Sequence, residues 1–128
     1  MHAAAGNLKK VSLELGGKSP NIVFDDADQG AAEAAASAIF FNHGQCCVAG
    51  SRLFMQRSRF DEVVEGVAEI AKSIKLGPGM SADTQMGPLV SAEQLQRVTG
   101  YLDSGRSEGA CHALTCVSMA PPSRPACP

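Results

Sequence analysis

The chain has 128 residues, which is enough for about one domain with one buried core. Hydrophobic residues make up 45% of the chain and charged residues 19%, a balance typical of a folded globular protein. The formal net charge of -2 gives no general attraction to nucleic acid or to an anionic membrane surface. No apolar run approaches the roughly 18 residues of a membrane span, and the N-terminus lacks the features of a signal peptide. We therefore expect a cytoplasmic protein.

Two short strands are predicted near the N-terminus. Residues 11–15 alternate between apolar and polar side chains, which is the period of a strand, with Glu14 facing away from the apolar side. The Gly16-Gly17 pair ends this strand. Residues 21–24 form a second candidate, so the first part of the chain predicts two strands with a glycine turn after the first.

An alanine-rich helix and a cysteine-bearing loop come next. Asp28 can cap a helix that runs to about Asn42. The many alanines of this helix allow close packing against a neighbouring layer. Residues 42–50 contain two glycines and the adjacent Cys46 and Cys47, which indicates a loop.

The second half of the chain begins with a strand and the clearest helix. Residues 52–56 form the expected strand. Ser58 is a candidate cap for the helix, and residues 77–79 (Gly-Pro-Gly) are expected to end it. Apolar side chains recur at helical spacing with charged residues on the other faces; they are Phe60, Val63, Val64, Val67, Ile70, Ala71 and Ile74.

A third helix is expected to start at Ser91 or Ala92, with Leu95, Val98 and Leu102 on one side. Strands that alternate with helices predict an α/β fold. From residue 110 to residue 128 periodicity is lost and prolines accumulate, so we expect this tail to be disordered.

The chain has an odd number of cysteines, and two of them are adjacent in sequence. Neighbouring cysteines fit disulfide geometry poorly, and no CxxC pair is present, so neither a disulfide framework nor a metal site is predicted. The pattern favours free thiols in a reducing compartment. The five are Cys46, Cys47, Cys111, Cys116 and Cys127.

Three motifs together resemble the NAD(P)-dependent aldehyde dehydrogenase superfamily. They are LELGGKSP at residues 13–20, FFNHGQCCVAGSR at residues 40–52 and QMGPL at residues 85–89. The first two are similar to the glutamate and cysteine active-site signatures of that family. The loop sequence resembles that of bacterial phenylacetaldehyde and related broad-range enzymes.

The resemblance implies a chain several times this length, with a separate Rossmann-type cofactor domain and assembly into dimers or tetramers. Residues 1–109 would be part of its three-layer α/β catalytic domain, without the dinucleotide-binding half. After Ala110 the family continues differently, so residues 110–128 are interpreted as an out-of-family tail produced by truncation or a frameshift.

The resemblance also assigns the site residues. Cys47 matches the nucleophile, and its backbone N–H would form half of an oxyanion hole. Glu14 matches the general base, while Leu15 and Gly16 match positions whose backbone lies against the nicotinamide ring of NAD or NADP. The expected reaction oxidises an aldehyde to a carboxylic acid through a thiohemiacetal and a thioester on the cysteine.

Several alternatives stay open. Cys46 is the alternative nucleophile, and His43 could be taken for a partner of a catalytic cysteine. The polypeptide could be a non-catalytic truncated fragment, or a thiol redox or acyl-carrying protein that uses both adjacent cysteines. Because the cofactor domain and one oxyanion donor of the family are not in this sequence, we expect the isolated chain not to oxidise aldehydes.

Overall fold

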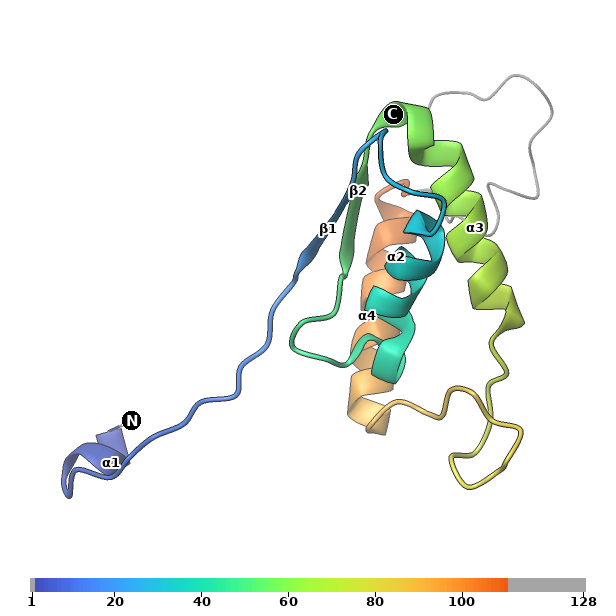
Figure 1. Ribbon diagram of the computed structural model, residues 1–128. Coiled ribbons are helices and arrows are strands. Elements are labelled where there is room, and N and C mark those ends of the chain that lie inside the picture. Colours follow the sequence, from blue (N-terminus) through green and yellow to red (C-terminus); the bar gives the residue numbers. More distant parts are fainter. Residues whose placement is uncertain (1, 111–128) are drawn as a thin grey trace.

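The computed structural model describes residues 2–110, so the tail predicted at residues 110–128 lies outside the described part except for its first residue. Figure 1 shows the order of the elements along the chain. They are α1 (His2–Ala5), β1 (Pro20–Val23), α2 (Ala31–Phe40), the 3-10 helix η1 (Phe41–Gly44), β2 (Arg52–Met55), the 3-10 helix η2 (Arg57–Arg59), α3 (Phe60–Ser73) and α4 (Ala92–Ser107).

Strands β1 and β2 form a parallel pair, and α2 lies in the crossover connection between them. Pro20 lies opposite Arg52, and the register continues to Val23 opposite Met55. This β-α-β arrangement confirms the predicted α/β class. The strands expected at residues 21–24 and 52–56 are confirmed to within one residue at each end.

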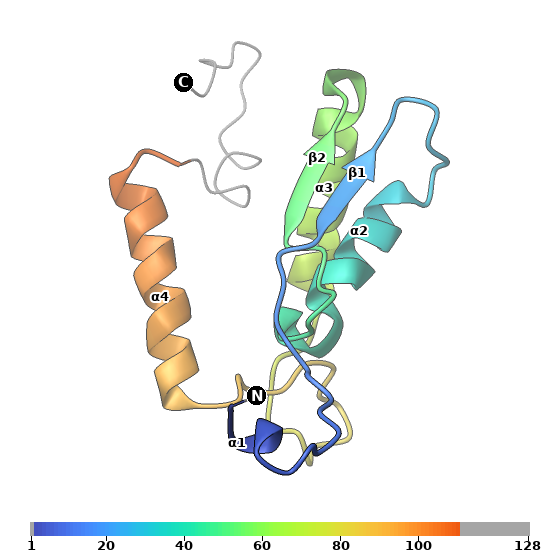
Figure 2. The same cartoon turned by 90° about the vertical axis from the view of Figure 1, so that its left-hand side faces the viewer.

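Helices α2 and α3 lie side by side on one face of the strand pair, as the two views in Figures 1 and 2 show. Val23 from β1, Ala31 from α2 and Val63 from α3 form the centre of the core. Val63 is only 1% exposed, which makes it the most completely buried large side chain in the described part. Four partly buried side chains pack around this centre; they are Ala27, Leu53, Met55 and Val67.

The apolar period predicted for α3 is confirmed, but both expected end signals are wrong. Ser58 lies within η2, and the helix is preceded by Arg59, whose side chain makes no capping hydrogen bond. The helix ends at Ser73, because Ile74 already has extended backbone angles, several residues before the Gly-Pro-Gly turn. Periodicity therefore identified the helix better than the punctuating residues did.

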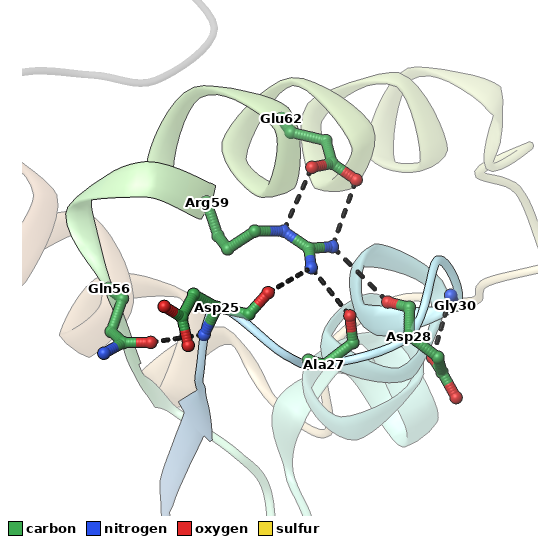
Figure 3. Close-up of polar contacts among 7 residues, drawn as sticks. All are labelled: Asp25, Ala27, Asp28, Gly30, Gln56, Arg59 and Glu62. Atoms are coloured by element: carbon green, nitrogen blue, oxygen red, sulfur yellow. Dashed lines mark hydrogen bonds and ion pairs between the residues drawn. The ribbon is translucent and has the colours of Figure 1, made fainter.

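Arg59 joins the start of α3 to the loop between β1 and α2 (Figure 3). Its guanidinium donates hydrogen bonds to the carbonyl oxygens of Asp25 at 3.2 Å and Ala27 at 2.7 Å. Its Nε also lies 3.0 Å from a carboxylate oxygen of Glu62. Asp28, predicted as the cap of α2, instead accepts from the backbone of Gly30 at 2.9 Å, and Gly30 is the N-cap. These contacts fix the edge of the sheet at which β1 and β2 end.

Helix α4 starts as predicted, because the Ser91 side chain accepts a hydrogen bond from the backbone of Gln94 at 3.1 Å. Figure 2 shows this helix standing apart from α2, α3 and the strands. Its apolar Leu95, Tyr101 and Leu102 are exposed. Neither α4 nor another helix in residues 2–110 has the length and apolar character to cross a membrane.

The strand predicted at residues 11–15 is not formed. These residues belong to the extended segment that leads from α1 to β1, and their side chains are exposed. A strand needs a neighbouring backbone to complete its hydrogen-bond ladder, and in the described part β1 pairs only with β2. The alternating pattern correctly indicated an extended conformation, but it could not supply a partner.

Replacing a glycine by alanine is predicted to have opposite effects on stability in α3 and in α4. A Cβ atom added at Gly66 would lie 2.6 Å from the Cβ of Ala32, whereas one at Gly100 in α4 would meet nothing within 4 Å. We expect Gly66→Ala to lower the free energy of unfolding by about 1–3 kcal/mol through overpacking. Gly100→Ala should raise it by about 0.5–1 kcal/mol, because alanine favours helix.

Urea denaturation of the two variants and the unmodified chain measures both effects. If Gly66→Ala is as stable as the unmodified chain, α2 and α3 do not pack as closely at Gly66 as described.

Candidate active site

An open groove of about 540 Å³ is bordered by three parts of the chain that are far apart in sequence. The first is the extended segment before β1, the second is the loop between α2 and β2, and the third is the start of α4 with the residues before it. The lining residues are Glu14, Leu15, Gly16, Gly17, Lys18, His43, Gly44, Gln45, Cys46, Cys47, Ala49, Ser51, Leu89, Val90, Gln94 and Val98. All four of the residues expected to form the site therefore border one groove.

The loop that carries the cysteines starts with an unusual backbone. Asn42, His43 and Gly44 have φ angles of 47°, 61° and 71°, all in the left-handed region. Glycine adopts this region at little cost, while asparagine and histidine adopt it less readily than glycine but more often than most other residues. The run reverses the chain immediately after α2 and brings the cysteines to the groove.

The two cysteines differ in their surroundings, although both thiols are free. Cys46 is half-buried, and the side-chain amide of Asn42 lies 3.9 Å from its sulfur, within reach of a weak N–H···S contact. Cys47 is exposed and borders the groove. A reactant can therefore approach Cys47 more easily than Cys46.

The far end of the loop is fixed to the body of the domain. Ala49 is buried, with 5% of its surface exposed. The backbone of Gly50 donates to the carbonyl of Ala38 in α2 at 2.9 Å. A Cβ atom on Gly50 would lie 3.0 Å from that of Ala38, so the loop returns very close to the helix that it leaves. This contact determines where the loop joins β2.

The glutamate segment touches the cysteine loop through its backbone. A Cβ atom added at Gly17 would lie 3.0 Å from the carbonyl oxygen of Cys47, so only glycine lets the two segments approach this closely. Glu14 lies three residues before Gly17 and has an exposed side chain. The contact gives the glutamate segment a defined place beside the cysteine.

The third border of the groove was not anticipated from the sequence. Leu89 and Val90 lie before α4, and Gln94 and Val98 lie in its first turns. The QMGPL motif at residues 85–89 contributes to the family resemblance, but the resemblance assigns it no role. Gln94 and Val98 are spaced by one helical turn, which is the only sequence signal that places them on one face.

Comparisons with known proteins identify the family. The family model described as "Aldehyde dehydrogenase family" matches residues 1–121. This chain belongs to the aldehyde dehydrogenase family. It is 50% identical over 111 residues to the betaine aldehyde dehydrogenase of Bacillus subtilis, a match that covers 86% of this chain and 23% of that protein. It is 51% identical over 109 residues to an aldehyde dehydrogenase of Davidiella tassiana, covering 84% and 22%.

Solved aldehyde dehydrogenases share the fold. A variant of the Bacillus cereus enzyme matches with a TM-score of 0.80 at 48% identity, covering 88% of this chain and 23% of that chain. Betaine aldehyde dehydrogenase from Staphylococcus aureus, solved in complex with NAD+, matches with a TM-score of 0.73 at 45% identity, covering 83% and 21%. The present chain thus spans somewhat more than a fifth of the length of these aldehyde dehydrogenases.

The glutamate segment is open to solvent where Leu15 and Gly16 border the groove. Leu15 is 70% exposed, and a Cβ atom added at Gly16 would meet nothing within 4 Å. An open backbone without a side chain allows a flat aromatic group to approach closely. Nothing in the described part of the chain obstructs the approach of such a group at Leu15 or Gly16.

Proposed function

We propose that this chain carries the catalytic cysteine and the general base of an enzyme that oxidises an aldehyde to a carboxylic acid with NAD+ or NADP+. One observation carries the proposal: Glu14 and Cys47 come from distant segments, yet both border one groove, and their segments are in contact at Gly17. The enzyme is proposed to be cytoplasmic and homo-oligomeric.

Cys47 is the proposed nucleophile. Its thiolate adds to the carbonyl carbon of the aldehyde, so that a C–S bond forms and the carbonyl oxygen takes the negative charge. The backbone N–H of Cys47 is proposed to donate to that oxygen as half of an oxyanion hole. The exposure of Cys47 supports this role over the half-buried Cys46, which is in contact with Asn42.

Leu15 and Gly16 are proposed to hold the nicotinamide end of the cofactor. When bound, NAD(P)+ supplies the hydride acceptor of the oxidation. The open space at Gly16 supports this placement. The similarity to a Staphylococcus aureus enzyme that was solved with NAD+ supports the cofactor class.

Glu14 is the proposed base for the hydrolytic half of the reaction. Its carboxylate takes a proton from a water molecule as the water oxygen attacks the thioester carbonyl. The C–S bond then breaks, the thiolate of Cys47 is restored and the carboxylic acid leaves, while the proton taken by Glu14 is released to solvent. The exposed position of Glu14 gives water access to its carboxylate.

A chimera tests the proposal, because the chain spans only part of its relatives. In the Bacillus cereus enzyme, the matching segment is replaced by residues 1–109 of this chain, and NAD(P)H formation is measured with aldehydes that the parent oxidises. We expect the chimera to oxidise them. If a folded chimera that assembles like its parent has no activity, this segment does not form a competent site and the proposal is wrong.

The close contact at Gly17 gives a further prediction for the chimera. Gly17→Ala should lower kcat by about tenfold, because the added methyl displaces the Cys47 backbone by a few tenths of an ångström. Gly6→Ala is the matched control, since a Cβ atom there meets nothing within 4 Å and Gly6 does not border the groove. Steady-state rates decide the outcome, and equal effects of the two substitutions would contradict the contact.

A further inference from the structure

Gln45 connects the cysteine loop to a different part of the chain. Its side-chain Oε1 accepts a hydrogen bond from the backbone N–H of Val90 at 3.2 Å, across 45 positions of sequence. Its Nε2 lies 3.5 Å from Nδ1 of His43, which accepts a hydrogen bond when that nitrogen carries no proton. One carboxamide therefore bridges two walls of the groove.

The loop needs such a contact because its own backbone does not favour its shape. Asn42 and His43 both have positive φ angles, which cost free energy for residues with side chains. The His43 ring also lies against the third wall, since a Cβ atom on Gly87 would be 3.6 Å from its Nε2. Gln45 and His43 thus both lie near the segment before α4.

In the described part of the chain, no other side chain of this loop makes a hydrogen bond to a distant segment. Asn42 contacts Cys46 within the loop, and the Gly50 anchor uses backbone atoms on the β2 side. Without the Gln45 bridge, the residues between the left-handed run and the Ala49 anchor would keep only backbone contacts: the hydrogen bond from Ala49 N–H to the Cys46 carbonyl, and the close approach of Gly17 to the Cys47 carbonyl. Cys46 and Cys47 lie in that stretch.

We propose that Gln45 is a positioning residue that holds Cys47 in the groove by tying its loop to the backbone of Val90. It acts through the conformation of the loop and not on the reacting atoms. The inference rests on the proposed function, because it concerns the placement of the proposed nucleophile.

The test uses the 128-residue chain and iodoacetamide as the thiol probe. Alkylation of Cys46 and Cys47 is followed separately by tandem mass spectrometry. The rate at Cys47 divided by the rate at Cys46 is then compared among variants. We expect Cys47 to react faster in the unmodified chain, because it is the more exposed thiol. In Gln45→Leu the ratio should fall by about fivefold, the population change that one net hydrogen bond allows.

Two further variants separate positioning from general destabilisation. Gln45→Glu keeps an oxygen that accepts from Val90, so it should restore most of the ratio. Gln56→Leu removes a similar amide-to-backbone contact, with Asp25, at the opposite end of β2, and it should leave the ratio unchanged. An unchanged ratio in Gln45→Leu, or an equal change in Gln56→Leu, would overturn the proposal.

Hydrogen exchange of the unmodified chain tests whether the Gln45–Val90 hydrogen bond is formed, even if Gln45→Leu does not fold. The Val90 amide should exchange at least about fivefold more slowly than an unprotected amide. Exchange at the unprotected rate would show that the bridge is not formed, and the proposal would then fail. Failure here leaves the activity of the chimera untouched, whereas an inactive chimera leaves the alkylation ratios untouched, so the two proposals fail separately.

Discussion

Cys47→Ser is expected to reduce aldehyde oxidation by the chimera by about 10⁴-fold or more. Removing a nucleophile that forms the covalent intermediate costs far more than removing a binding contact, because the reaction loses its whole pathway. The serine hydroxyl is a much weaker nucleophile than a thiolate at neutral pH. Steady-state NAD(P)H formation measures the loss.

Cys46→Ser is the matched control for this prediction. It makes the same chemical change on the adjacent residue, and Cys46 is half-buried. We expect the variant to keep most of the activity of the chimera. If Cys46→Ser abolishes oxidation while Cys47→Ser keeps it, the nucleophile has been assigned to the wrong sulfur.

Glu14→Gln should slow hydrolysis of the thioester by about 10²–10⁴-fold, because it removes the proposed base and keeps the size of the side chain. Formation of the thioester should continue, since Cys47 is unchanged. Stopped-flow measurements should therefore record a burst of NAD(P)H followed by a slow steady state.

Glu65→Gln makes the same change on an exposed position of α3, away from the groove, and should behave like the unmodified chimera. Loss of the burst itself in Glu14→Gln would mean that Glu14 acts before the thioester is formed.

Local patterns predicted most of the elements. The apolar stripe of α3 specifies a helix because each side chain meets its neighbours within one or two turns. The start of α4 at Ser91 or Ala92 was also predicted correctly, and the contact that caps it is local, since Gln94 is only three residues from Ser91. The strands at residues 21–24 and 52–56 were also identified, because short apolar runs between turns fit a half-buried sheet.

The caps expected at Asp28 and Ser58 were local errors, whereas two other failures involve contacts between distant residues. The segment at residues 11–15 has the right period for a strand, but no partner strand in the described part completes its ladder. Arg59 donates hydrogen bonds to carbonyl oxygens more than thirty positions away, and no local sequence pattern predicts such a contact.

The candidate site also combines residues that the sequence predicted with contacts that it did not predict. The family motifs identified Glu14, Leu15, Gly16 and Cys47, all of which border the groove. They gave no indication that Gln45 reaches Val90, or that Gln94 and Val98 from α4 form the third wall. Those relations depend on where α4 lies in space, which periodicity within one helix does not specify.

Mapping the covalent intermediate tests the central claim most directly. The Glu14→Gln chimera is mixed with an aldehyde and NAD(P)+, quenched in acid and digested, and the acylated residue is located by tandem mass spectrometry. The account predicts an acyl group on the sulfur of Cys47 that hydroxylamine removes. An acyl group on Cys46, or none on either cysteine while NAD(P)H is formed, would contradict it.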